Sequence, residues 1–131
     1  MNKWLIALLI VVLALAANFW LLGRGPSSVT YIGVLPGADC AGLKTELTLF
    51  RNNTYFLRET YLATKNGDVT YVSSGKWQTV KPGKNEIVQL TLDRPGEFYN
   101  FLRKDSDHLL VVGNDLRPID SPMNLTLTRQ K

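Results

Sequence analysis

Residues 43–72 read LKTELTLFRNNTYFLRETYLATKNGDVTYV, and this stretch decides the fold. Leu47 and Leu49 alternate with polar residues before the pair Asn52-Asn53, and a similar alternation resumes after the pair. A period of two places apolar side chains on one face of a β-strand. Asn tolerates the left-handed backbone of a tight turn. This stretch therefore predicts consecutive antiparallel strands.

The sharpest hairpin signal in the stretch is Lys65-Asn66-Gly67-Asp68. Asn-Gly is favoured in two-residue turns because both residues accept positive φ angles. Working outward, further turn formers separate short runs of β-branched and aromatic residues. The strands predicted in this way are 29–34, 43–50, 54–62, 69–80, 86–92, 98–103, 108–112 and 123–128.

About eight short strands, with no amphipathic helix among them, predict an all-β domain. We expect a small antiparallel β-barrel, because closure removes the unpaired sheet edges that invite aggregation. Residues 25–131 suffice for one such domain and are too few for two. The net charge of +4 is not concentrated in any basic block, so nucleic acid is not an expected partner.

The N-terminal segment, residues 4–22, contains no charged side chain and follows Lys3. As a helix it would rise about 28 Å, which nearly matches the ~30 Å hydrocarbon core of a bilayer. Trp20 would then lie near the membrane interface, where Trp is enriched. We expect residues 1–24 to form a membrane anchor, with residues 25–131 displayed outside the cytoplasm.

The alternative for this segment is a cleaved secretory signal, because Lys3 supplies a minimal charged start and Ala14-Leu15-Ala16, within the apolar stretch, supplies a small-residue cleavage site. Cleavage near Ala16 or Ala17 would leave the apolar residues 19–22 exposed at the new N-terminus. The uncleaved anchor keeps them in lipid and is the interpretation we favour. Both interpretations place the domain outside the cytoplasm.

A loop rich in small residues interrupts the first two strands, and residues 33–45 read GVLPGADCAGLKT. This loop, the segment 75–77 (GKW) and the closing segment 116–125 (LRPIDSPMNL) together resemble the N-terminal domain of the NlpE family of bacterial envelope lipoproteins. The resemblance covers most of residues 30–128. The residues that carry the family's loop are Pro36, Asp39, Cys40 and Gly42.

The resemblance implies a lipocalin-like barrel in a non-enzymatic protein of the cell envelope. It implies a role in copper resistance and copper homeostasis, in envelope stress sensing, or in both. Signalling proteins of the Cpx type are the implied partners. Combined with an anchor at residues 4–22, it places the domain in the periplasm, held at the inner membrane.

The chain departs from the family pattern at two cysteine positions. The family loop carries Cys-x-x-Cys, whereas here Gly37 occupies the first position and Cys40 is the only cysteine of the chain. One thiolate needs other soft ligands to hold copper tightly, so a metal site at Cys40 competes with a plain packing role. The family's lipid-bearing cysteine is also missing, since residues 15–18 read LAAN. A protein helix then replaces the lipid tether.

Other residues support a second hypothesis, a lipocalin-like carrier that holds a small apolar ligand inside the barrel. Aromatic side chains of the strands could line such a cavity, although they more often fill a core. They are Tyr55, Tyr71, Trp77, Phe98, Tyr99 and Phe101. Asp39 is interpreted as a turn cap and His108 as a surface residue, and no catalytic residue or obligatory cofactor is predicted. A third hypothesis makes Cys40 a thiol switch in mixed disulfides.

Overall fold

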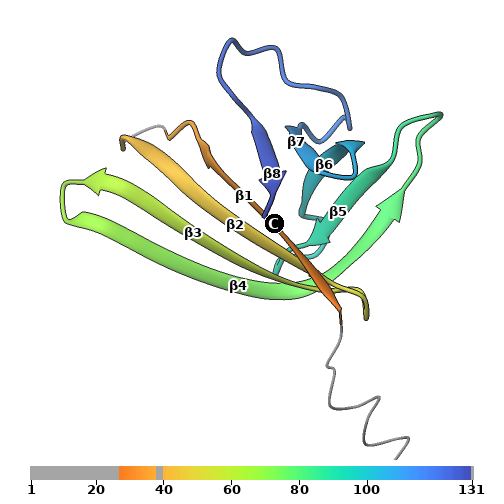
Figure 1. The fold of residues 1–131 in the computed structure, drawn as a ribbon, viewed down its shortest axis with the longest axis horizontal. Helices are drawn as coiled ribbons and strands as arrows, with labels where there is room; N and C mark the ends of the chain where they lie inside the picture. Colours follow the sequence, from red (N-terminus) through yellow and green to blue (C-terminus); the bar gives the residue numbers. More distant parts are fainter. Residues whose placement is uncertain (1–26, 38–39, 131) are drawn as a thin grey trace, which may run out of the picture.

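The computed structural model describes residues 27–37 and 40–130, so the segment 4–22 and Asp39 lie outside the described residues. Eight strands form a closed antiparallel barrel in which each strand pairs with its neighbours in sequence and β8 closes onto β1 (Figure 1). The predicted all-β barrel is confirmed. The strands are β1 (Ser28–Leu35), β2 (Gly42–Phe50), β3 (Thr54–Thr64), β4 (Gly67–Val80), β5 (Ile87–Thr91), β6 (Phe98–Asp105), β7 (His108–Val112) and β8 (Thr126–Arg129).

Apolar side chains from every strand except β4 form a buried cluster that fills the barrel interior. β4 contributes Trp77, which is partly buried and packs against this cluster. Leu47 and Leu57 sit opposite each other on β2 and β3, as the alternation in the sequence predicts. Each fully buried aliphatic or aromatic side chain contributes about 1.5 to 3 kcal/mol. The buried cluster consists of Tyr31, Leu35, Leu47, Leu49, Tyr55, Leu57, Val88, Leu90, Phe101, Leu109 and Leu127.

β4 is the longest strand and belongs to both sides of the barrel. Its residues up to Lys76 pair with β3, and Trp77–Val80 pair with β5. Figure 1 shows β4 running along the base of the molecule and joining the two sides. The first part of β4 carries exposed apolar side chains, with Tyr71 at 61% and Val72 at 60% exposure. Apolar side chains are therefore more exposed to solvent on this part of β4 than in the rest of the barrel wall.

The β3–β4 hairpin differs from the predicted two-residue turn, in which Asn66 and Gly67 would both have positive φ angles. Lys65 and Asn66 form the turn, while Gly67 already starts β4 with a φ of 82°. The second positive φ nearby belongs to Ala63, at 52°, instead of Asn66. The β3–β4 register shifts just before the turn, and a bulge of this kind supplies the twist that a two-residue Asn-Gly turn would otherwise provide.

The last strand begins later than predicted. It was expected over 123–128, whereas β8 spans Thr126–Arg129. The Asn124 side-chain oxygen accepts the backbone N–H of Thr126 at 3.1 Å, and such a local turn keeps the preceding residues out of the sheet. At the other predicted turn, Asn53 takes the expected left-handed backbone with a φ of 67°.

Within the part of the chain that the structure describes, no helix is long and apolar enough to cross a membrane.

Candidate functional site

The barrel has two ends that differ in construction. We call the loop end the one formed by residues 36–37 and 40–41, between β1 and β2, together with the β3–β4 turn. We call the cavity end the one where β1 begins and where β2 turns into β3. There the Arg51 backbone N–H donates to the Ser27 carbonyl at 2.9 Å, which fixes the start of the barrel next to that turn (Figure 1).

At the loop end, Cys40 is half-buried and its thiol donates to the Gly42 carbonyl at 3.2 Å. The loop is held against β3 because the Ala41 N–H donates to the Leu62 carbonyl at 2.9 Å. A side chain built at Gly37 would collide with the Cys40 sulfur. The thiol therefore occupies the space into which a first cysteine of the family motif would point.

Of the other predicted loop residues, Pro36 and Gly42 are described by the structure and Asp39 is not. Pro36 is exposed, and Gly42 is buried. A Cβ at Gly42 would come within 2.8 Å of a Val34 methyl, so the loop can return to the sheet only through a residue without a side chain. Asp39 lies outside the described residues, and its predicted capping role stays a prediction.

Potential metal ligands do not gather around the thiol in the described part of the chain. No group of three or more His, Cys, Asp or Glu side chains that could hold an ion occurs among residues 27–37 and 40–130. His108 instead pairs with Asp105, with 2.8 Å between His Nδ1 and a carboxylate oxygen. The Asp107 backbone N–H, and then the His108 ring, lower the pKa of Asp105. The predicted metal-binding role of Cys40 therefore stays a prediction.

A cluster that the sequence did not indicate lies near Cys40. The Tyr61 and Tyr71 rings meet edge to face with centroids 5.5 Å apart. Burial raises the pKa of the Glu59 carboxyl, and burial together with the neighbouring Glu59 charge raises the pKa of both Tyr61 and Tyr99. Like charges repel in this partly desolvated space. A further negative charge directly beside Glu59 is therefore disfavoured.

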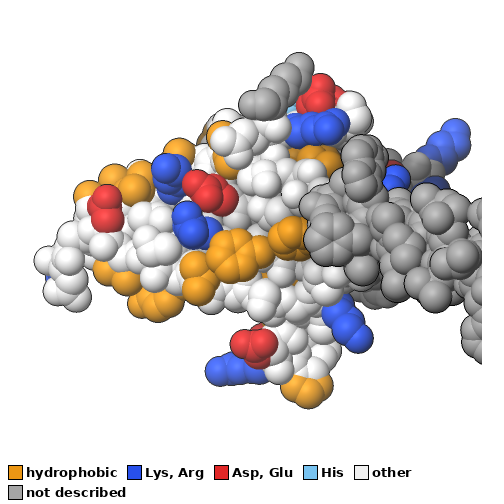
Figure 2. Space-filling view, turned by 60° about the horizontal axis from the view of Figure 1, so that its bottom comes forward, with side chains coloured by type: hydrophobic (Ala, Val, Ile, Leu, Met, Phe, Trp, Pro, Cys, Tyr) orange, Lys and Arg blue, Asp and Glu red, His pale blue; other side chains and the backbone are white. Residues whose placement is uncertain are grey.

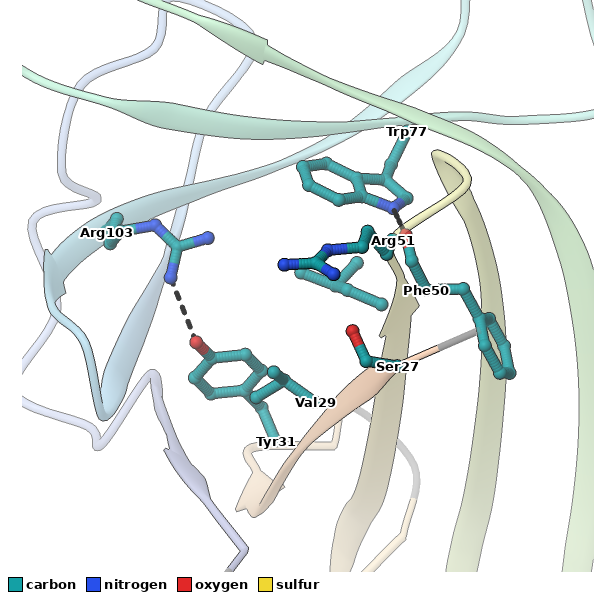
Figure 3. A pocket seen from close by; sticks show the side chains of 8 residues that line it. Ser27, Val29, Tyr31, Phe50, Arg51, Trp77 and Arg103 are labelled. Atoms are coloured by element: carbon teal, nitrogen blue, oxygen red, sulfur yellow. Dashed lines mark hydrogen bonds between the residues drawn. The ribbon is translucent and has the colours of Figure 1, made fainter. Parts of the chain in front are cut away.

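At the cavity end, a cavity of about 200 Å³ opens beside the start of β1 (Figure 3). It combines an apolar and aromatic wall with two guanidinium groups, which come from different hairpins. The residues that line it are Ser27, Val29, Tyr31, Leu49, Phe50, Arg51, Trp77 and Arg103.

Hydrogen bonds between strands hold the wall of this cavity. The Trp77 indole N–H donates to the Phe50 carbonyl at 3.0 Å. Arg103 donates to the Tyr31 hydroxyl at 2.9 Å, and that hydroxyl donates in turn to the Ser106 carbonyl at 3.1 Å. The first bond ties β4 to the end of β2, and the other two tie β1 to the β6–β7 hairpin, so the cavity is a built feature of the barrel.

The strand aromatics divide between core and surface. Tyr55 and Phe101 are buried in the core, as expected of aromatics at strand spacing. Tyr99 stacks on Phe101 with ring centroids 4.5 Å apart. Trp77 lines the cavity, whereas Tyr71 and Phe98 are exposed.

The short motif 75–77 has a visible packing reason. A Cβ at Gly75 would approach Tyr55 at 3.0 Å and the Thr91 carbonyl at 3.1 Å. The glycine thus leaves room for the Tyr55 hydroxyl to donate to that carbonyl at 2.9 Å. Trp77 follows two residues later, on the same face of β4, and contacts the core and the cavity.

The cavity itself was missed by reasoning from the sequence. Arg51 and Arg103 lie half the domain apart, in different hairpins, and neither belongs to a basic run. Only the closed barrel brings them to one end. The sequence feature that could have indicated the cavity is Trp77, because it belongs to the family-like segment 75–77 and lines the cavity.

Comparisons with known proteins agree with this barrel. Residues 31–122 match the model of the NlpE N-terminal domain. The chain is 32% identical over 102 residues to lipoprotein NlpE of Escherichia coli strain K12, which covers 78% of this chain and 41% of the relative. The chain thus spans less than half the length of that relative.

Two solved structures have a similar fold. The crystal structure of the Cpx pathway activator NlpE from Escherichia coli aligns with a TM-score of 0.58 and 31% identity, covering 76% of this chain and 48% of that one. A Shewanella oneidensis protein aligns with a TM-score of 0.63 and 24% identity, covering 80% and 88%, and this likeness bears on the fold alone. Since the family model matches most of the barrel, the chain belongs to the NlpE family through the N-terminal domain of that family.

Proposed function

We propose that this protein is a non-enzymatic component of the cell envelope that takes part in stress signalling of the Cpx type. The observation that carries the proposal is its place in the NlpE family, together with 31% identity to a relative described as a Cpx pathway activator. The chain matches only part of that relative, so the barrel is proposed to act through the region it shares.

We propose further that residues 1–24 hold the barrel, residues 25–131, at the inner membrane with the barrel in the periplasm. The uncharged stretch 4–22 supports an anchor of this kind. A segment cleaved near Ala16 or Ala17 would instead release the barrel into the periplasm. Alkaline extraction of membranes, followed by mass analysis of the N-terminus, separates the two.

Copper enters the proposal as a weak and secondary ligand. Cys40 offers a half-buried thiol that already donates a hydrogen bond to the Gly42 carbonyl. A single thiolate of this kind can share a soft ion such as Cu(I) with a donor from another protein. Copper tolerance would then depend on Cys40 less than it does in a family member with both loop cysteines.

The experiment that tests the signalling role is deletion of the protein in its own host, with a reporter of the Cpx-type response. Reintroducing the full chain should restore the reporter output that deletion changes. A Trp77→Ala chain serves as the control for a damaged barrel, and Cys40→Ser separates the thiol from the rest. Unchanged reporter output and unchanged copper sensitivity after deletion would contradict the proposal.

A second candidate function, the binding of a small ligand within a lipocalin-like barrel, is favoured by the cavity end. The cavity of about 200 Å³ is smaller than the ~300 to 1,000 Å³ usual for ligand pockets. Buried side chains also occupy the middle of the barrel. A ligand carried here would therefore be no larger than a fragment, and native mass spectrometry of the purified chain would detect it.

A further inference from the structure

We propose that the cavity end binds the phosphate group of an anionic membrane lipid, with Arg51 as the main contact and Arg103 as the second. Figure 3 shows the two guanidinium groups directed into the same space below Trp77. Two positive charges that converge without an intervening acid favour an anion between them. None of the residues that line the cavity is acidic.

The hydrogen-bonding groups of the wall leave donors for a ligand and few acceptors. The Trp77 indole is used by the Phe50 carbonyl, and the Tyr31 hydroxyl by its two partners. Arg103 also lies 3.5 Å from a Glu86 carboxylate oxygen, which offsets part of its charge. Arg51 forms no ion pair or side-chain hydrogen bond with the described residues, so its five N–H donors are available to an oxyanion.

The shape of the cavity selects a phosphate group with a few carbons attached. A volume of about 200 Å³ corresponds to roughly seven water-sized groups at ~30 Å³ each. That room holds a phosphate and the first carbons of its ester, and the acyl chains of a lipid would extend beyond it. Val29 and Leu49 supply an apolar wall for those carbons. Arginine suits this role, because its planar fork can donate two parallel hydrogen bonds to one phosphate.

The covalent chain brings this end of the barrel close to lipid, and here the inference rests on the proposed membrane anchor. Residue 22 ends the apolar stretch, and the described barrel begins at Ser27. Five residues of fully extended chain reach at most about 18 Å. The Arg51 backbone is bonded directly to Ser27. An anchored chain therefore holds the cavity within reach of lipid headgroups, where local concentrations of anionic phosphate are high.

The test uses the purified full chain in detergent, labelled with ¹⁵N, and follows the indole N–H signal of Trp77 by NMR. Dihexanoyl phosphatidylglycerol, a soluble short-chain lipid, is the probe. It should shift the Trp77 signal saturably, and Arg51→Gln should weaken its binding by about tenfold, as loss of a charge-assisted contact implies. Arg51→Lys should be intermediate. Arg58→Gln is the matched control, because Arg58 pairs with Glu46 at 3.8 Å and does not line the cavity.

Two further ligands identify the source of the anion. Dihexanoyl phosphatidylcholine should bind several-fold more weakly, because its choline cation meets the arginines. Inorganic phosphate should bind more weakly still, because it lacks the carbons that contact the apolar wall. Phosphate binding as tight as that of the lipid would overturn the assignment to a lipid.

Equal binding by Arg51→Gln and the unaltered chain would overturn the site itself. Arg51→Glu provides a second check, since charge reversal should abolish the shift, and the midpoint of urea unfolding shows whether either variant has lost its fold. The soluble probe needs neither an inserted anchor nor a signalling partner. Failure of this site is therefore distinguishable from failure of the proposed signalling role or of the anchor.

Discussion

The cavity end and the loop end of this barrel differ in how their aromatic side chains are held. At the cavity end, Trp77 and Tyr31 use their polar atoms to tie strands together. At the loop end, Tyr61 and Tyr71 make aromatic contact with each other, and Tyr71 is 61% exposed. From this difference we expect aromatic side chains at the end where the chain enters the barrel to contribute more to stability than those at the loop end. The loop end carries Gly37, at the position where the family motif has its first cysteine.

The largest expected difference between the two ends concerns two aromatic residues of the same strand. Trp77→Ala should destabilise the domain by about 3 kcal/mol, since the side chain packs on the core and its indole is bonded. Tyr71→Ala should cost less than about 1 kcal/mol, because the residue is mostly exposed. Urea unfolding of the full chain in detergent measures both. Equal losses would break the comparison.

The next effect concerns copper at the loop end. Gly37→Cys restores the family's two thiols and should raise Cu(I) affinity by about tenfold or more, since loss of even a supporting group costs a site 10- to 100-fold. The loop must shift to admit the new side chain, which would otherwise collide with the Cys40 sulfur. Competition with a coloured Cu(I) chelator gives the affinity, and Gly37→Ser is the control. An unchanged affinity would show that the loop no longer permits chelation.

A smaller difference in stability is expected between the removal of two tyrosine hydroxyls, one at each end. Tyr31→Phe removes the hydroxyl that links Arg103 to the Ser106 carbonyl, which should cost about 1 to 2 kcal/mol, because both partners lose a partly buried hydrogen bond. Tyr61→Phe should stay within about 0.5 kcal/mol, as its hydroxyl forms no hydrogen bond with the described residues. Midpoints of urea unfolding compare the two. A larger loss of stability for Tyr61→Phe than for Tyr31→Phe would contradict the expectation that the cavity end contributes more to stability.

The smallest effect is the pH dependence contributed by Glu59. Burial raises the pKa of this carboxyl above its ordinary 4.5, so the folded state favours the protonated form. The corresponding stability is fully present below the unfolded pKa and is lost as the pH rises through the folded pKa. Glu59→Gln should flatten stability across that window and stabilise the domain slightly at neutral pH. A steeper pH profile for Glu59→Gln than for the unaltered domain would contradict this assignment.

The sequence predicted the strands well because the determinants of strands are local. Alternation around Leu47 and the turn at Asn53 depend only on neighbouring residues, and both predictions are confirmed. The β3–β4 turn was wrong in detail because a bulge near Ala63 depends on the register of two long strands. Local pattern cannot reveal such a register.

The candidate site was predictable only where it followed a family motif. Cys40 was identified from its loop, and the structure shows its hydrogen bond and its contact with the space at Gly37. Arg51 and Arg103 could not be paired from the sequence, because barrel closure alone brings their hairpins together. The shifted pKa of Glu59 was equally hidden, since burial of a carboxyl depends on residues from several strands.

The orientation of the barrel at the membrane tests the central claim, that the cavity end faces the lipid. In a Cys40→Ser background, single cysteines replace Asn52 at the cavity end or Asn66 at the loop end, both in exposed turns (Figure 1). β3 between these turns spans about 35 Å at ~3.3 Å per residue. Figure 2 shows charged side chains of both signs on the face it presents, so this face is not a uniformly basic surface that would itself set the orientation.

The measurement is the quenching of a fluorophore on each cysteine by lipids that carry a spin label in the headgroup, with the full chain in vesicles. If the cavity end faces the lipid, quenching should be strong at Asn52→Cys and slight at Asn66→Cys. Equal quenching at the two positions, or stronger quenching at Asn66→Cys, would contradict it.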